Sequence, residues 1–312
     1  MQIFKGRPSI DFMGRRHIAM LLSAVLMVLS IGSLVTQGLN FGIDFTGGTL
    51  IEVVYPQPVD LGDVRGALAE GDFGQTQTQH FGTSRDVLVR IAPQEGRESA
   101  QLSEDVLRVL RKHIPDVQMR RVEFVGPQVG KELTEQGGLA MIYALIGILI
   151  YIIVRFQWRF APGAVIALIH DVLIIIGIFS LFQLDFDLTV LAALLAIIGY
   201  SLNDTIVVFD RIRENFRRIR KATPIAVVNT SINQTLSRTL MTSFTTLLVL
   251  TALFVFGGEV IHSFSMALLL GVVVGTYSSI YVASTAALAL GISKADLMPV
   301  KKESGEREGR GM

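Results

Sequence analysis

The stretch that decides the fold runs from Gly199 to Asn215 and reads GYSLNDTIVVFDRIREN. It continues an apolar run that starts near Leu188, and it ends in a cluster of arginines. An apolar run of about 20 residues matches the hydrocarbon core of a bilayer. Asp204 therefore lies inside a predicted membrane span, where an ionisable side chain costs about 2.5–3.5 kcal/mol. Such a residue indicates a functional site with a partner, or else a fixed polar contact that only holds helices together.

Half of the 312 residues are hydrophobic, and they come in blocks. This composition is too apolar for a soluble protein and predicts a polytopic α-helical membrane protein. The chain has no cysteine, which excludes disulfides, thiol catalysis and thiolate metal sites. It also has no metal-binding His spacing, no phosphate-binding GxxxxGK loop and no GxSxG nucleophile motif. We therefore expect no enzyme activity, no cofactor and no metal site.

A short basic segment, residues 1–16, precedes a first apolar run over 17–36. A cleaved signal peptide is the alternative interpretation. The run is long for a signal peptide and ends without an A-x-A cleavage pattern, so we interpret it as a retained first span. Basic residues gather at the cytoplasmic ends of membrane helices, which predicts a cytoplasmic N-terminus.

Residues 37–138 are polar and contain no run long enough to cross a membrane. Because this segment separates the first two spans, it is expected on the periplasmic side. Asp60 is placed to cap its first helix. The predicted order, β-α-β-β-α-β, is the ferredoxin-like pattern of an α+β domain. Hydrophobic periodicity predicts strands at 49–55, 75–81, 86–91 and 117–125 and helices at 60–71 and 99–114.

Five further apolar runs bring the number of predicted spans to six. Basic residues fall in alternate loops, which places both termini in the cytoplasm. The connection over 210–238 is basic. Its residues 210–236 are amphipathic, and we interpret them either as a helix along the cytoplasmic interface or only as a topology signal. Residues 295–312 are predicted to form a charged, disordered tail. The later spans are predicted at 139–156, 162–182, 189–209, 239–257 and 264–290.

Polar side chains recur at similar predicted depth on neighbouring spans. Asp204 and Arg238 are placed to approach each other, because the fourth span ends and the fifth begins on the same side of the membrane. Their residue types fit a proton relay, although hydrogen-bonded helix packing would use the same residues. The accessory candidates, for relay or for packing, are His170, Asp171, Tyr200, Asn203 and Thr242.

Two strings carry a resemblance to a known family. FGIDFTGG spans 41–48, just after the first span, and GYSLNDTIVVFDRIREN spans 199–215. They occur together with His170-Asp171 in the third span and with Ser237-Arg238-Thr239 at the start of the fifth. From about residue 10 to 292 the chain resembles the SecD/SecF family of protein-export membrane proteins, in its SecF branch. That family is related to the resistance-nodulation-division transporters.

The resemblance implies a six-span bundle with a periplasmic ferredoxin-like domain in the bacterial inner membrane. It implies a role in the late, ATP-independent translocation of preproteins, powered by the proton gradient. Asp204 and Arg238 fall on the family's proton-relay positions. Members of the superfamily work as two six-span halves, so the resemblance implies SecD as a partner that supplies a further acidic relay residue. The SecYEG translocon, YajC as an optional component, and unfolded preprotein are the other implied partners.

The string after the first span also has an interpretation of its own. Gly42, Gly47 and Gly48 permit tight backbone geometry where the chain leaves the membrane for the sheet. Asp44 is interpreted as a turn or interface residue instead of a catalytic one.

Three alternatives to a proton-driven subunit stay open. The chain could be a non-conducting scaffold of the translocon, in which the buried charges serve only specificity. It could be a half-transporter that exports lipids or small molecules. Asp171 and Asp204 on adjacent spans would also suit an intramembrane aspartyl protease, but the Gly-x-Gly sequence of such proteases is absent before Asp204. The coupling ion, proton or sodium, is left open too.

Overall fold

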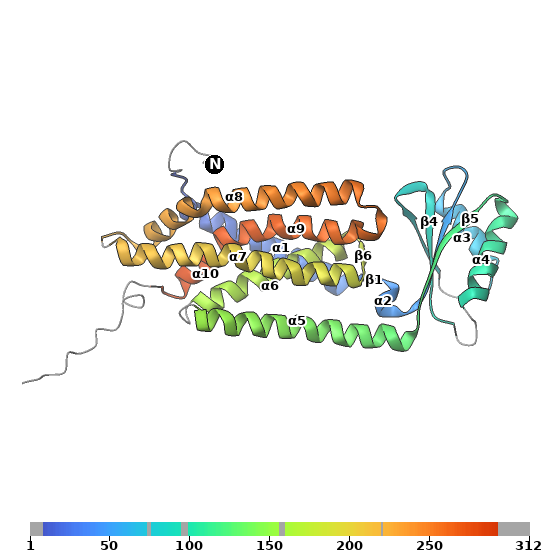
Figure 1. The fold of residues 1–312 in the computed structure, drawn as a ribbon, viewed down its shortest axis with the longest axis horizontal. Coiled ribbons are helices and arrows are strands. Elements are labelled where there is room, and N and C mark those ends of the chain that lie inside the picture. The colour runs from blue at the N-terminus through green and yellow to red at the C-terminus, as the bar shows by residue number, and fades with distance from the viewer. Residues whose placement is uncertain (1–8, 74–75, 95–98, 156–159, 220, 293–312) are drawn as a thin grey trace, which may run out of the picture.

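The structure, a computed structural model, describes residues 9–73, 76–94, 99–155, 160–219 and 221–292. A bundle of long helices carries a small α+β domain at one end (Figure 1). The helix ends rich in arginine lie at the opposite end of the bundle, where α7 passes into α8. The α+β domain that the sequence predicts between the first two spans is thus a separate domain at one end of the bundle.

Within the described residues, six helices are long and apolar enough to cross a bilayer, which confirms the predicted polytopic membrane protein. A single 3-10 turn, Met13–Arg15, precedes the first, and another, Glu259–Ile261, precedes the last. The last helix continues through a π-helical turn, Ser279–Ala283, into α10, Ser284–Ala289. The main helices are α1 Arg16–Thr36, α5 Pro127–Arg155, α6 Phe160–Leu181, α7 Leu188–Arg218, α8 Pro224–Phe256 and α9 His262–Ser278.

Several helices are longer than their apolar runs. α7 continues to Arg218 and α8 begins at Pro224, so residues 210–218 and 224–236 extend two spans, and the predicted interfacial helix over 210–236 is wrong. Hydropathy marks only the part of a helix that faces lipid, whereas the helix itself continues until its backbone is capped. Thr223 supplies that cap for α8 by accepting a hydrogen bond from Ala226 N, with Pro224 in the first turn.

The α+β domain has the predicted β-α-β-β-α-β order, with the four strands in the spatial order β3-β4-β2-β5, all antiparallel. Alternate residues such as Ile51 and Val89 are buried beneath the two helices, against Leu68 and Leu110. The other face of the sheet is turned toward the helix bundle (Figure 1). The elements are β2 Gly48–Val54, α3 Leu61–Ala69, β3 Thr76–Phe81, β4 Thr83–Ile91, α4 Ser99–His113 and β5 Gln118–Val125.

Asp60 caps α3 as predicted, since its carboxylate accepts a hydrogen bond from Gly62 N at 2.6 Å. Three short elements were not predicted: β1 Asn40–Phe41, α2 Ile43–Thr46 and β6 Asp185–Phe186. β1 and β6 pair in parallel and join the segment after α1 to the loop between α6 and α7. Segments of two to four residues are too short to show a periodicity.

Two glycines set the packing of α9 against α7. A Cβ on Gly271 would lie 2.4 Å from Cγ1 of Ile197, and one on Gly275 would lie 3.1 Å from Cβ of Ser201. The glycines therefore permit a close helix approach, which is the role that their GxxxG spacing predicts.

Gly48 provides a test of the domain's attachment. Its φ is 119°, and a Cβ there would lie 2.4 Å from the carbonyl oxygen of Ile91. We expect Gly48→Ala to destabilise the protein by more than about 1 kcal/mol, because both the backbone conformation and the space require glycine. The measurement is the temperature at which half of the detergent-solubilised protein leaves its monodisperse chromatographic peak.

Gly66→Ala is the matched control, because Gly66 lies within α3 and a Cβ there would meet nothing within 4 Å. We expect no loss, or a small gain from the better helix former. Equal effects at the two positions would contradict the packing argument.

Candidate functional site

α7 carries Asp204 and packs against α6, α8 and α9. Two carboxylates accept hydrogen bonds from backbone N–H groups in the first turn of α7. Asp187 accepts a hydrogen bond from Val190 N at 2.9 Å, and Asp44 accepts one from Leu188 N at 3.0 Å. Carboxylates stabilise a helix N-terminus by accepting its unpaired N–H groups and by opposing its dipole. Asp44 therefore lies at an interface, where it ties the segment after α1 to the start of α7.

The glycines of the same motif allow this close packing. Gly42 N donates to Phe186 O at 2.8 Å, and a Cβ on Gly42 would lie 3.1 Å from Cβ of Asp187. Gly47 has a φ of 71°, and a Cβ there would lie 3.0 Å from Cα of Pro127, the first residue of α5. The motif thus brings together the end of α1, the start of α7, the start of α5 and the sheet.

Asp204 is buried in the bundle, with 3% of its surface exposed. Its Oδ2 is buried and accepts no hydrogen bond from the part of the chain that the structure describes. A buried carboxyl group without a partner is costly, far more so when it is ionised. Asp204 is therefore the kind of residue that a purely structural role explains poorly.

Arg238 lies on α8 and is exposed. It lines a cleft of about 880 Å³ between α7 and α8, together with Asn203 and Gln234. The cleft extends to the arginine-rich end of α7, where Arg211 and Arg218 both pair with Glu214, at 2.7 and 3.0 Å. A charged cleft thus leads from the end of the bundle to the residue next to Asp204.

The predicted direct pair of Asp204 and Arg238 is not formed between these two described residues, although Arg238 is near enough to act on Asp204 electrostatically. Successive residues of a helix point about 100° apart, since 3.6 residues make one turn. Asn203 therefore faces the cleft while Asp204 faces the bundle interior. The sequence places the two charges at one depth but does not determine the direction of each side chain.

One accessory candidate, Thr242, makes no hydrogen bond to another helix within the described residues. The hydroxyl of Thr242 donates within its own helix, to Arg238 O at 3.1 Å and to Thr239 O at 2.9 Å. The neighbouring Ser243 makes the contacts between helices instead, with Tyr200 Oη at 3.4 Å and with Thr276 Oγ1 at 2.7 Å. Ser243 and Thr276 replace Thr242 in the polar contact between α7, α8 and α9.

The register of α7 against α8 identifies a second unpaired group. Asn215 donates to Ser231 at 2.8 Å near one end of the pair, and Tyr200 meets Ser243 near the other. Because the helices are antiparallel, Asp204 comes level with Thr239. The Oγ1 of Thr239 is buried and, like Oδ2 of Asp204, lacks a hydrogen-bond partner among the described residues.

Asp171 on α6 has the opposite environment. Only 1% of its surface is exposed, and both of its oxygens have partners. Oδ2 accepts from Ser201 Oγ at 2.5 Å and from Ser278 Oγ at 2.7 Å, and Oδ1 lies 2.9 Å from Nδ1 of His170. The network joins α6 to α7 and α9, so Asp171 is held firmly in place.

The network continues from His170 to α1 and back to α9. Nε2 of His170 lies 3.1 Å from Oγ of Ser23, which lies 3.0 Å from Oη of Tyr277. Tyr277 donates its one proton to Ala19 O at 2.6 Å, so Ser23 donates to Tyr277 and accepts from Nε2. A further proton is then needed between Nδ1 and Asp171, which makes the His170–Asp171 pair neutral overall. A neutral pair is the state that burial in a membrane favours.

Sequence reasoning selected His170 but not the serines that complete the Asp171 network. Ser23, Ser201 and Ser278 look like the small residues of any membrane helix, and no local signal distinguishes them. Within the described residues, no three His, Asp or Glu side chains gather as they would around a metal ion.

Two family models match the chain. "Protein export membrane protein SecD/SecF, C-terminal" covers residues 105–293, and "SecD/SecF GG Motif" covers 32–59. The protein translocase subunit SecF of Vibrio alginolyticus is 53% identical over 98% of each chain. The chain belongs to the SecF family. SecF of Pseudomonas aeruginosa is 52% identical over 93% of this chain and 94% of its own, and SecF of Escherichia coli O157:H7 is 47% identical over 97% and 94%.

A solved structure extends this comparison with SecF to three dimensions. The crystal structure of SecDF from Thermus, described as a translocon-associated membrane protein, matches 92% of this chain with 38% identity and a TM-score of 0.84. This chain spans only 39% of the SecDF chain. A second SecDF structure, in a super-membrane-facing form, gives a TM-score of 0.69 over the same share. The arrangement of the matched part therefore differs between those two structures.

The Asp171 network leads to a prediction on α9. Ser278→Ala removes one of the two hydroxyls that donate to Asp171 Oδ2, and we expect a loss of about 1–2 kcal/mol of stability. Ser265→Ala is the matched control: Ser265 is equally buried on the same helix, but its hydroxyl donates to Ile261 O and, within the described residues, to no carboxylate. Thermal stability in detergent measures both. The contact with Asp171 is unimportant if the two variants lose the same stability.

Proposed function

We propose that this SecF-family chain is one half of a proton-driven machine that completes the late, ATP-independent translocation of preproteins across the bacterial inner membrane. Membership of the family establishes the general role in protein export. The single observation that supports the finer proposal is the buried Oδ2 of Asp204, which has no hydrogen-bond partner among the described residues and lies beside a charged cleft that contains Arg238.

Protonation would change what Asp204 can contact. An ionised Asp204 attracts the guanidinium of Arg238, which makes no hydrogen bond or ion pair with the described side chains. A protonated Asp204 loses this attraction and is cheaper to bury in the bundle. Binding or release of the proton would then decide which of two arrangements of α7 and α8 has the lower free energy.

The cleft supports a path between Asp204 and the arginine-rich end of the bundle. By the positive-inside rule that end is cytoplasmic, and both chain termini are then cytoplasmic as well. The α+β domain at the opposite end would face the periplasm and the emerging preprotein (Figure 1). Neutral His170–Asp171 suits helix packing or an accessory step of the relay, and Ser201 links this pair to α7.

SecD is the proposed partner, as the second six-span half. The support for this proposal is the similar SecDF structure, in which the matched segment is only part of a longer chain. SecYEG, YajC and the unfolded preprotein are proposed as the wider assembly.

The test measures preprotein export into inverted membrane vesicles, with and without an imposed proton gradient. We expect Asp204→Asn to abolish the gradient-stimulated part while assembly and ATP-driven export remain, because an amide neither ionises nor transfers the proton. Asp63→Asn is the control, since Asp63 is an exposed carboxylate on α3. Equal stimulation of wild type and Asp204→Asn would instead favour a non-conducting scaffold.

Two further comparisons refine the test. Arg238→Lys should retain more of the stimulated export than Arg238→Gln, because lysine keeps the charge that attracts Asp204. Replacing the proton gradient by a sodium gradient identifies the coupling ion. A half-transporter for lipids or small molecules would leave preprotein export unchanged in all of these variants.

Asp171→Asn separates packing from relay. If the pair with His170 only holds helices together, the amide lowers thermal stability and leaves the gradient response intact. If Asp171 takes part in the relay, the gradient response falls in protein that assembles normally.

A further inference from the structure

Among the described residues, two attachments join the α+β domain to the helix bundle. One is covalent: the chain passes into the sheet at Gly47-Gly48 and leaves it at Gly126. These two connections run side by side, since Gly48 and Val125 are partners in the β2–β5 ladder and a Cβ on Gly47 would lie 3.0 Å from Pro127. Side-by-side connections through glycines form a single hinge instead of two fixed points.

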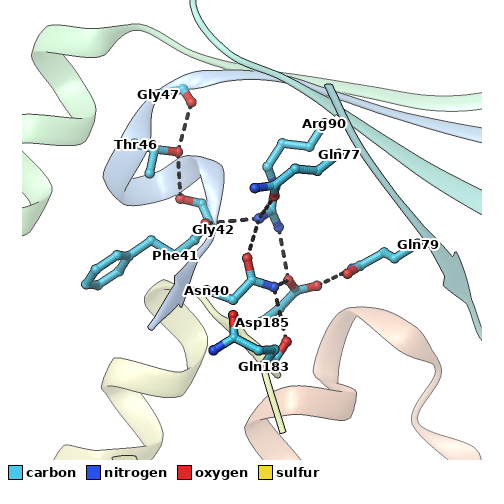
Figure 2. A network of polar contacts seen from close by, with 10 residues as sticks. All are labelled: Asn40, Phe41, Gly42, Thr46, Gly47, Gln77, Gln79, Arg90, Gln183 and Asp185. Carbon is cyan, nitrogen blue, oxygen red and sulfur yellow. Dashed lines mark hydrogen bonds and ion pairs between the residues drawn. The ribbon is translucent and has the colours of Figure 1, made fainter. Parts of the chain in front are cut away.

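The second attachment is not covalent. It joins the bundle side of the sheet to the loop that leads into α7 (Figure 2). Arg90 on β4 forms an ion pair with Asp185 on β6, with Nη2 and Oδ1 3.1 Å apart. Gln79 on β3 donates to the other oxygen of Asp185, and Asn40 on β1 donates to Oδ1 at 2.8 Å. We call these four residues the latch.

Arg90 makes further contacts across the same boundary. Its Nη1 donates to Phe41 O at 3.0 Å and to Asn40 Oδ1 at 3.3 Å (Figure 2). The side chains of Arg90 and Asp185 are only 15% and 23% exposed, so water screens their attraction less than at an open surface. The contacts of Arg90 thus fasten β4 to both β1 and β6.

The hinge and the latch lie on different strands. The hinge belongs to β2 and β5, the latch to β4 and β3, and the sheet order is β3-β4-β2-β5. Their midpoints are two strand spacings apart, about 10 Å at ~4.8 Å per spacing. A hinge alone would let the domain rotate, whereas a second contact at this distance prevents it.

The latch is also connected to the helix that carries Asp204. Asp185 lies three residues before Leu188, the first residue of α7, and Asp187 between them caps that helix. A displacement of α7 therefore moves Asp185, and Arg90 with it.

We propose that Asn40, Gln79, Arg90 and Asp185 are positioning residues that make the α+β domain follow α7, so that a change at Asp204 becomes a rotation of the domain about Gly47-Gly48 and Gly126. The part of this inference that concerns energy coupling rests on the proposed function. The fastening of the domain does not.

The test separates these two parts with a thiol probe. Because the chain has no cysteine, Leu88→Cys would supply its single thiol. Leu88 is 6% exposed and alternates with Arg90 on β4, so it faces the bundle side of the sheet. In the full chain with its SecD half, we expect Asp185→Asn and Arg90→Gln to raise the rate of labelling by a membrane-impermeant maleimide several-fold without a gradient.

Arg120→Gln is the matched control. Arg120 pairs with Glu52 at 3.0 Å and with Asp86 at 3.4 Å on the same domain, but it does not contact the latch. The hydrogen bond to Glu52 raises the pKa of Arg120. Labelling that is unchanged by Asp185→Asn, or that rises equally in Arg120→Gln, would overturn the latch.

Export completes the test. We expect Asp185→Asn to lose most of the gradient-stimulated export and to keep wild-type levels of assembled complex and ATP-driven export, with Arg90→Lys retaining more than Arg90→Gln. Faster labelling with unchanged stimulation would show that the latch only fastens the domain, and would overturn its coupling role. If Asp204→Asn keeps its stimulation, the proposed function fails, and the labelling rates still decide whether the latch exists.

Discussion

A carboxyl group inside a bilayer has no water to satisfy it, and this constraint separates the two aspartates of the bundle. The carboxyl oxygens of Asp171 have hydrogen-bond partners in Ser201, Ser278 and His170. The assignment of donors and acceptors in this network gives the His170–Asp171 pair no net charge. Asp204 lies one turn along α7 from Ser201, and its buried Oδ2 has no hydrogen-bond partner in the described part of the chain. Asp171 therefore has its hydrogen bonds already formed. Asp204 can still form new ones, and a change between two conformations requires such a difference in contacts.

Burial is unevenly shared among the six spans. The membrane-spanning parts of α6, α7 and α9 are about half buried, whereas at most 22% of those of α1, α5 and α8 is buried. Arg238 thus lies on a peripheral helix, and Asp204 on a central one.

The α+β domain has two kinds of contact with the helix bundle, a connection through the backbone and a contact between polar side chains. Gly47 and Gly48 adopt backbone conformations that other residues rarely adopt, and they bring β2 and β5 beside the start of α5. Asp44 and Asp187 anchor the bundle side of this connection to α7. Arg90 and Asp185 add a contact made only of polar groups, which can break without unfolding any element.

The sequence by itself determined the six spans, the β-α-β-β-α-β order of the soluble domain and the cap of α3, because hydrophobic periodicity, length and capping chemistry are local properties. It also identified Asp204, Arg238 and Asp171 as costly residues in a membrane. Only the tertiary structure decided their partners. Serines carry no signal until another helix brings a carboxylate to them, and the direction of Asp204 depends on how α7 is rotated against its neighbours. The latch joins residues 40, 79, 90 and 185, so only the folded chain brings its charges together.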